Sequence, residues 1–187
     1  MKIKDITLTP LKIRKSLLRI QTDSGVEGWA EAYGGDVFKA YLENVIRPTL
    51  IGEDPRQIER HWETLALGKD ERFYKLPASV VGAIDLALWD LLGKEAGMPV
   101  YILMGGAARK TIPLYWSVGS GWRMQPEEML KLVEQGWDQG YRSFKIRMDW
   151  RGWRQDIDPH KDYRMFQLVR EFLAPEIYLG FDANNGY

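Results

Sequence analysis

The sequence contains no cysteine, which excludes disulfide bonds, thiolate metal sites and a cysteine nucleophile. It also carries no net charge, because 26 lysines and arginines balance 26 aspartates and glutamates. Without a surplus of either sign, nothing favours binding to nucleic acid or to an anionic membrane. No uncharged apolar run approaches the roughly 20 residues that span a bilayer, and the opening MKIKDITLTP lacks the apolar stretch of a signal peptide. We therefore expect a cytoplasmic protein that binds neither nucleic acid nor a membrane.

Histidine is scarce as well, since His61 and His160 are the only two in 187 residues. Each lies in or beside a predicted helix, and we expect both at the protein surface rather than acting as catalytic bases. Apolar residues, in contrast, make up 45% of the chain. That proportion is typical of a globular protein with a buried core.

Residues 1–108 have the pattern of a small α+β domain. Three segments alternate polar and apolar residues as strands do: 2–11, 16–23 and 26–33. Two helices follow, one beginning near Val37 and one running from about residue 55 to 65. We expect the first to be broken by Pro48, Gly52 and Pro55. The stretch 77–97 is apolar nearly all round a helix, which predicts burial on most sides.

Beyond residue 108 the pattern changes to strands that alternate with helices. The predicted order is strand 111–119, helix 126–140, strand 143–148, helix 158–175 and strand 177–183. Such an alternation predicts parallel βαβ units in a separate domain.

Two cations share one face of the strand at 143–148. Side chains alternate along a strand, so Lys145 and Arg147 lie opposite the apolar Phe144 and Ile146. Both faces of a parallel sheet are normally covered. In a (β/α) barrel, however, the inner face opens at its carboxyl end into the mouth of the active site, where cations have a use. The competing interpretation is an edge strand with a solvated polar face.

Asp182 stands at the end of the following strand, and Gly180 and Asn184 share its face. A carboxylate suits a hard cation such as Mg²⁺, although the competing interpretation is a simple turn. Because parallel strands carry function at their carboxyl ends, we expect Asp182 beside Lys145 and Arg147. Such a site would suit removal of a proton next to a carboxylate, with a desolvated lysine whose pKa is lowered toward that of a usable base.

Five segments taken together resemble the enolase superfamily, in its mandelate racemase/muconate lactonizing enzyme branch. They are GVEGWAEA, IRPTLIGEDPRQIERHWE, GAIDLALWDLLGKEAGMPVYILMGG, GYRSFKIRM and GFDANNGY. The resemblance covers nearly the whole chain in the right order. It implies that residues 1–108 form an α+β capping domain. Residues 109–187 would then be the first βα units of a modified TIM barrel, which is (β/α)7β in the complete family fold.

The resemblance also implies a chemistry. Family enzymes bind Mg²⁺ through three carboxylates, remove the proton α to a substrate carboxylate and stabilise the resulting enediolate. Asp182 matches the first metal ligand, and Lys145 and Arg147 match a K-x-K motif on the second barrel strand. Because arginine stays protonated it is a poor base, which favours a one-base acid-sugar dehydratase, a lyase, over a two-base racemase. Arg147 would then bind the substrate carboxylate, and Lys145 would do the same or act as the base.

Other residues are candidate contacts to a small carboxylate substrate, expected to be a hydroxy acid. In the family the capping domain supplies specificity through two loops, which here would fall near residues 11–16 and at Phe73 and Tyr74. Tyr115 and Ser117 on the first barrel strand, and Asn184 after the third, complete the predicted substrate contacts. The complete protein is expected to be a homo-oligomer.

The chain ends after the third predicted barrel strand, so we expect it to be a fragment without activity of its own. The alternatives that stay open are a racemase, epimerase or cycloisomerase of the same family, which would be an isomerase, and a truncated non-catalytic remnant.

Overall fold

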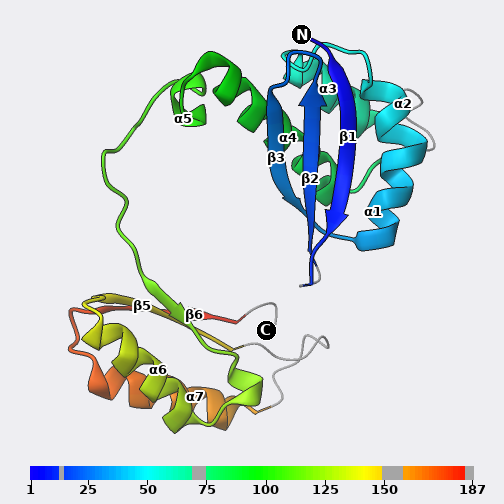
Figure 1. Ribbon diagram of the computed structural model, residues 1–187. Coiled ribbons are helices and arrows are strands. Elements are labelled where there is room, and N and C mark those ends of the chain that lie inside the picture. The colour runs from blue at the N-terminus through cyan, green and yellow to red at the C-terminus, as the bar shows by residue number, and fades with distance from the viewer. Residues whose placement is uncertain (13–14, 69–74, 149–157, 184–187) are drawn as a thin grey trace. The chain divides into compact units, whose positions relative to one another are not determined.

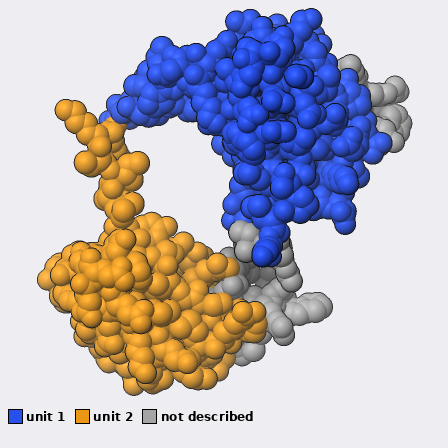
Figure 2. All heavy atoms as spheres, in the orientation of Figure 1, with its two compact units in different colours: residues 1–108 blue, residues 109–187 orange. Residues whose placement is uncertain are grey.

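The computed structural model describes residues 1–12, 15–68, 75–148 and 158–183. The chain forms two compact units, Met1–Ala108 and Arg109–Tyr187, which Figure 2 shows in separate colours. Each unit has its own cluster of buried apolar side chains. Within the described residues, no helix is both long enough and apolar enough to cross a bilayer.

The first unit is built on an antiparallel sheet in the order β1-β2-β3, formed by β1 (Ile3–Pro10), β2 (Ser16–Thr22) and β3 (Glu27–Ala32) (Figure 1). The register places Leu18 of β2 between Leu8 and Ala30 of its neighbours. Because side chains alternate along each strand, this register collects the apolar residues on one face. Ile6 and Leu18 are fully buried there. The three predicted strands are therefore present, and their period-two pattern marks the core face.

One continuous helical run follows the sheet, composed of α1 (Gly35–Tyr41), the π-helical η1 (Leu42–Ile46) and α2 (Arg47–Leu50). The prediction that Pro48 breaks this run is wrong. Pro48 lies in the first turn of α2, where its missing N–H costs little. The run ends instead at Ile51, which is extended, and at Gly52, whose φ of 85° favours glycine.

Helix α3 (Ile58–Leu67) begins three residues later than Pro55, where the sequence pattern placed its start. His61 on this helix was predicted at the surface, and the structure corrects that prediction. The side chain is 3% exposed, and Nε2 lies 2.8 Å from the backbone oxygen of Asp54. His61 thus anchors the chain segment that leads into its own helix. His160, by contrast, is exposed at the start of α7 (Pro159–Phe172).

Helix α4 (Ala78–Ala96) packs along the sheet and ends at Gly97, whose φ is 63°. As predicted, it is buried on most sides, with Ile84, Leu88 and Leu91 each at most 1% exposed. Gly28 of β3 permits the close approach, because a Cβ atom there would lie only 1.9 Å from the backbone oxygen of Ala87. A short helix that the sequence did not reveal, α5 (Val100–Leu103), follows.

The second unit is a parallel sheet in the order β4-β5-β6, formed by β4 (Trp116–Val118), β5 (Ser143–Arg147) and β6 (Tyr178–Asp182). The crossovers run through η2 (Gly121–Arg123) and α6 (Pro126–Asp138), then through α7. Figure 1 shows α6 and α7 on one side of this sheet. The alternation of strand and helix therefore gave the right topology. Each element is shorter than its predicted range, and β4 differs most from its prediction of 111–119, because its pairing with β5 begins at Trp116.

The helix-facing side of the sheet holds the core of the second unit. Phe144, Ile146 and Met148 are fully buried along β5. They pack with side chains of both helices and of the end of α7, namely Met129, Val133, Met165, Val169 and Leu173. Two N-terminal caps fix where the helices begin: Gln125 and Glu128 form a capping box for α6, and Asp158 accepts a hydrogen bond from the backbone N–H of Lys161 at α7. The apolar half of each strand therefore faces the helices, which leaves the polar half on the other face.

Candidate active site

The polar face of the second sheet brings together residues from all three strands. In the strand register Lys145 stands between Ser117 on β4 and Gly180 on β6, and Arg147 stands opposite Asp182. These residues share one face because side chains alternate along a strand and the helices cover the other face. Arg147 and Asp182 are also the last residues of β5 and β6. The predicted cluster is thus assembled at the carboxyl edge of a parallel sheet.

Lys145 and Asp182 form an ion pair, with Nζ of the lysine donating to Oδ2 of the aspartate at 2.9 Å. The two side chains are 30% and 33% exposed, so water still reaches the pair. Gly180 lies beside Lys145, and a Cβ atom there would lie at an ordinary contact distance of 3.6 Å from Cγ of Lys145. The contact joins residues that are 37 positions apart in the sequence.

This contact corrects the prediction of a lysine with a lowered pKa. The hydrogen bond to Asp182 raises the pKa of Lys145 above its ordinary value of 10.5, and partial burial opposes that change without reversing it. Lys145 is therefore a protonated donor in this arrangement.

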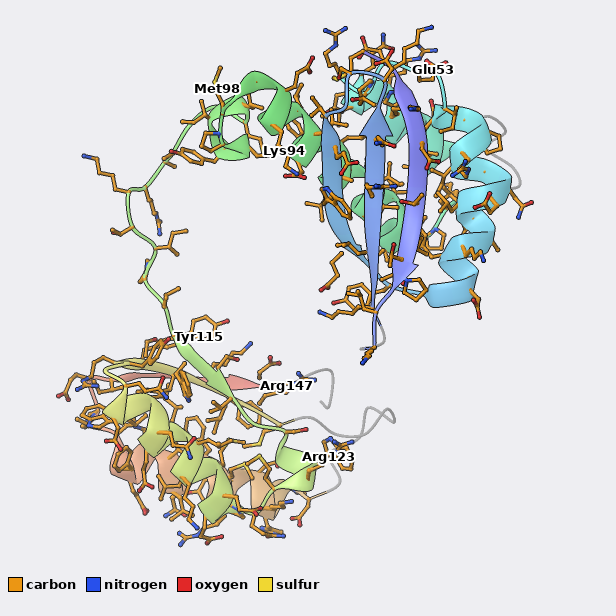
Figure 3. All side chains as sticks on the ribbon, viewed as in Figure 1. Glu53, Lys94, Met98, Tyr115, Arg123 and Arg147 are labelled. Atoms are coloured by element: carbon orange, nitrogen blue, oxygen red, sulfur yellow. The ribbon has the colours of Figure 1, made fainter. Side chains whose placement is uncertain are left out.

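Tyr115 joins the pair from the residue just before β4. Nζ of Lys145 lies 5.6 Å from the centroid of the Tyr115 ring, which is a cation–π distance. Tyr115 is 48% exposed and Ser117 is also exposed, so both can reach a solute at this face. Tyr115 and Arg147 are labelled in Figure 3, with Arg147 where β5 ends. The structure thus brings five of the predicted site residues onto one face: Tyr115, Ser117, Lys145, Arg147 and Asp182.

Asp182 has the right chemistry for a share in a Mg²⁺ site but does not make a whole one. Its carboxylate supplies the hard oxygen donors that Mg²⁺ prefers. Over the described ranges, however, no group of three histidine, cysteine, aspartate or glutamate side chains is placed to hold a metal ion. Among the residues that the structure describes, Asp182 can therefore supply one ligand of such an ion, and the other ligands would come from outside these residues.

Several predicted residues lie outside the described part of the chain. These are Phe73, Tyr74 and Asn184, together with the segment 149–157 that follows β5. A further segment at this edge follows β4, and in it Gly119 and Gly121 precede Trp122 and Arg123. The spacing of the two glycines is its only sequence signal. Gly119 has a φ of 103°, which favours glycine, and a Cβ atom at Gly121 would lie 3.2 Å from Cα of Met148.

The two units have the architecture of a capping domain followed by the start of a barrel. The first has an antiparallel sheet covered by helices, and the second has a parallel sheet with polar residues at its carboxyl edge. Residues 7–105 match the family model for the mandelate racemase/muconate lactonizing enzyme N-terminal domain. The chain therefore belongs to the mandelate racemase/muconate lactonizing enzyme family of the enolase superfamily. The first unit is its N-terminal capping domain, and the second has the partial parallel sheet with which the barrel begins.

Two curated relatives show the spread of activities in this family. A D-galactonate dehydratase family member of Streptomyces bingchenggensis is 32% identical over 90% of this chain and 47% of the relative. The D-galactarolactone cycloisomerase of Agrobacterium fabrum is 31% identical over 91% of this chain and 44% of its own length. Other relatives bear the names D-galactonate, arabinonate and D-mannonate dehydratase.

Solved structures match both units. D-glucarate dehydratase from Agrobacterium tumefaciens, in complex with magnesium, gives a TM-score of 0.82 at 28% identity and covers 98% of this chain and 54% of that one. This chain thus spans half or less of the length of the curated relatives it matches and about half of the solved structures.

Proposed function

We propose that the protein removes the proton α to the carboxylate of a small hydroxy acid with the help of Mg²⁺, and that the reaction is the dehydration of an acid sugar. The observation that carries this proposal is the placement of Lys145, Arg147 and Asp182 on one face, at the carboxyl edge of adjacent parallel strands. Two cations and a carboxylate at this edge match what a carboxylate substrate and a divalent cation require.

Each residue has a distinct task in this proposal. Asp182 would be one ligand of the Mg²⁺ ion, which when bound supplies positive charge that stabilises the negative charge developing on the substrate. Arg147 binds the substrate carboxylate through its planar guanidinium, which suits two parallel hydrogen bonds. Lys145 acts as a cationic donor because its pKa is raised. Tyr115 and Ser117 contact the substrate from the neighbouring strand.

The reaction balances as a β-elimination. The α carbon loses its proton to a base supplied from beyond the described residues, and the β hydroxyl leaves with a proton as water. The resulting enol becomes a keto acid by losing the proton of its α hydroxyl and taking up a proton at the β carbon. Arginine at position 147, where a lysine could have served as a second base, supports elimination over racemisation, because the guanidinium does not release its proton.

The named relatives support the same class of substrate. Several bear the names of sugar-acid dehydratases, and the matching glucarate dehydratase structure is a magnesium complex. These names describe those proteins. We propose the same class of substrate here because the face described above offers matching groups. We also propose that residues 1–187 alone do not turn over a substrate. The described residues supply one of the three carboxylates that the metal ion is expected to need.

The test uses the protein as its gene encodes it, with Mg²⁺ and a panel of acid sugars. Formation of a keto acid, together with loss of one water by mass spectrometry, is the expected result. Arg147→Gln should abolish turnover or raise KM at least 10-fold, which is the effect of removing a charge-assisted contact worth about 1.5 to 3 kcal/mol. Arg164→Gln, an exposed arginine on α7, is the matched control and should leave activity unchanged. No water loss from any acid sugar would refute dehydration.

A second candidate is an isomerase of the same family. The cycloisomerase among the relatives is the observation that favours it. Run in D₂O, an epimerase would incorporate deuterium at the α carbon without loss of water, and a cycloisomerase would convert a lactone to an isomer of unchanged mass. Either outcome would replace dehydration while keeping the proposed roles of Asp182 and Arg147.

A further inference from the structure

The sheet of the first unit ends in two edge strands, β1 and β3. The N–H and C=O groups along a sheet edge can pair with an extended segment of another chain. At β1 the chain's own backbone occupies part of the edge, because Ile3 donates its N–H to the oxygen of Glu53 at 2.9 Å and accepts from the N–H of Gly52 at 2.8 Å. Farther along, Nη1 of Arg47 donates to the backbone oxygen of Ile6 at 2.6 Å. The β1 edge is therefore partly closed from within the unit.

The edge of β3 is closed differently, by two side chains of α4. The backbone N–H of Trp29 donates to Oδ2 of Asp90 at 2.8 Å, and Nζ of Lys94 donates to the backbone oxygen of Glu27 at 3.1 Å. Nζ of Lys94 also lies 2.6 Å from Oδ2 of Asp90, so the two side chains form an ion pair. Figure 3 shows Lys94 on α4, near β3. One ion pair on a helix thus binds two backbone groups of the strand.

Those two backbone groups lie on the free side of β3. Among the described residues, β3 pairs with β2 alone. Backbone groups point alternately to the two sides of a strand, so residues 27 and 29 direct theirs to the same side. A fourth strand beside β3 would donate an N–H to the oxygen of Glu27 and accept the N–H of Trp29. Lys94 supplies that donor and Asp90 supplies that acceptor, so the ion pair makes the hydrogen bonds that a fourth strand would make.

Gly28, which lies between these two residues of β3, brings α4 close enough for the contact. A Cβ atom at Gly28 would lie only 1.9 Å from the backbone oxygen of Ala87. Asp90 and Lys94 follow Ala87 by three and seven positions, which places all three residues on one side of α4. The side chains of Asp90 and Lys94 are 35% and 47% exposed. Solvent therefore reaches this edge, and the two side chains rather than burial keep it closed.

We propose that Asp90 and Lys94 take the place of a fourth strand and thereby keep β3 from pairing with β3 of a second copy of this chain. A second copy is the partner because EGWAEA already forms a strand in this sheet, and every copy of the protein carries the same edge. Without the two side chains, the oxygen of Glu27 and the N–H of Trp29 are available to such a strand. The inference concerns the first unit alone and does not rest on the proposed function.

The first measurement is the hydrogen exchange of the Trp29 amide, followed by NMR in the 187-residue chain. Asp90 protects this amide in the wild type. In Asp90→Ala/Lys94→Ala its exchange should be about 10- to 100-fold faster, the factor expected for the loss of one hydrogen bond to a charged group. Amides that pair β1 with β2 should keep their exchange rates.

The second measurement asks whether the opened edge accepts a strand. The probe is a fluorescent peptide with the sequence of residues 26–33, VEGWAEAY. Its anisotropy should rise when the double alanine variant is added and stay unchanged with the wild type. The same peptide with methylated backbone nitrogens cannot donate hydrogen bonds, so it should not bind the variant.

A swapped variant separates the hydrogen bonds from the charges. Asp90→Lys/Lys94→Asp keeps an ion pair on α4 but presents a donor to the N–H of Trp29 and an acceptor to the oxygen of Glu27. It should therefore exchange and bind the peptide as the double alanine variant does. Circular dichroism checks that each variant is folded, and the swapped variant carries the test if the alanine variant is not.

The matched control is a pair of side chains at the same spacing on another helix. Gln167→Ala/Glu171→Ala removes a hydrogen bond on α7 and should change neither measurement. A wild type that binds the peptide would overturn the inference. So would a folded variant whose Trp29 amide exchanges no faster than in the wild type, or one that leaves the peptide unbound.

Discussion

Lys145 and Asp182 show that the protonation of one side chain depends on a contact with another strand. Lys145 lies on β5 and Asp182 on β6, and the hydrogen bond between them raises the pKa of the lysine. A lysine whose pKa is raised in the folded state contributes stability at any pH below its unfolded pKa. That contribution disappears as the pH rises through the higher, folded-state pKa.

Replacing the partner of Lys145 should therefore return its pKa toward 10.5. In Asp182→Asn the side chain keeps its size but loses its charge, so the pKa of Lys145 should fall, as followed by NMR of the Nζ resonance through an alkaline titration. Asp138→Asn, at an exposed position on α6, is the control and should leave the pKa of Lys145 unchanged. An unaltered Lys145 pKa in Asp182→Asn would mean that the ion pair is not formed.

The pKa of Asp54 is lowered, in contrast to that of Lys145. Nε and Nη2 of Arg56 donate hydrogen bonds to the Asp54 carboxylate at 2.9 and 2.7 Å. This contact lowers the pKa of Asp54 from 3.8 to about 2. The pair therefore contributes stability above pH 3.8, and that contribution is lost as the pH falls through about 2.

Arg56→Gln should raise the pKa of Asp54 part of the way toward 3.8, because the hydrogen bond from the backbone N–H of residue 56 remains. A carboxyl ¹³C titration measures this pKa directly. Arg60→Gln removes a neighbouring exposed arginine that lies 3.9 Å from Glu53 and should leave Asp54 unaffected. If the pKa of Asp54 does not move in Arg56→Gln, the paired hydrogen bonds are not its cause.

At the scale of elements, the contact between β3 and α4 depends on one missing side chain. Gly28 allows the backbone of β3 to approach α4 so closely that any Cβ atom would clash with the carbonyl oxygen of Ala87 and with Cβ of Leu91. The contact is reinforced beside it, where the carboxylate of Asp90 on α4 accepts a hydrogen bond from the backbone N–H of Trp29 at 2.8 Å. The strand and the helix are therefore locked at a fixed distance.

Gly28→Ala should lower the free energy of unfolding by about 2 kcal/mol or more, because the strand and helix must move apart. Gly82→Ala is the matched comparison, since nothing lies within 4 Å of a Cβ atom there and the position is helical. That change should stabilise the protein by about 0.5 to 1 kcal/mol through helix propensity. Urea unfolding of both variants gives the two values. Equal effects in both would show that backbone contact does not distinguish the positions.

Most elements could be predicted because their signals are local. Period-two alternation marks β1, β2 and β3, and the end signals of α6 and α7 lie within a few residues of each helix. The effect of Pro48 was mispredicted because the π-helical turn η1 comes just before it, so that Pro48 lies in the first turn of α2. The length of β4 was overestimated because a strand extends only as far as it pairs with its neighbour, and the position of that neighbour is not a local property of the sequence.

At the scale of the molecule, the two units differ in the cores that they bury. Among the described residues, the first unit collects 19 buried apolar side chains in one cluster and the second unit collects eight. The larger cluster draws on the sheet and on five helical segments of the first unit, α1, η1, α2, α3 and α4. Such a core should suffice for independent folding, because buried apolar area is the dominant favourable contribution to stability.

A polypeptide of residues 1–108 should therefore fold on its own and unfold in a single cooperative transition. Thermal unfolding followed by circular dichroism, and a dispersed amide NMR spectrum, are the measurements. Gly28→Ala in this shorter polypeptide should cost the same free energy as in the full chain, which ties the transition to the same core. A non-cooperative melt of residues 1–108 would show that the core requires the rest of the chain.

The sequence by itself determined the class of fold, the order of the strands and helices and the face on which Lys145, Arg147 and Asp182 lie. These features follow from periodicity and from the parity of a strand, which are properties of neighbouring residues. The burial of His61, the ion pair that raises the pKa of Lys145 and the approach of Gly119 and Gly121 to the end of β5 were decided by the tertiary structure. Each of these depends on a partner from another segment. Local sequence patterns carry no information about which distant segments come into contact.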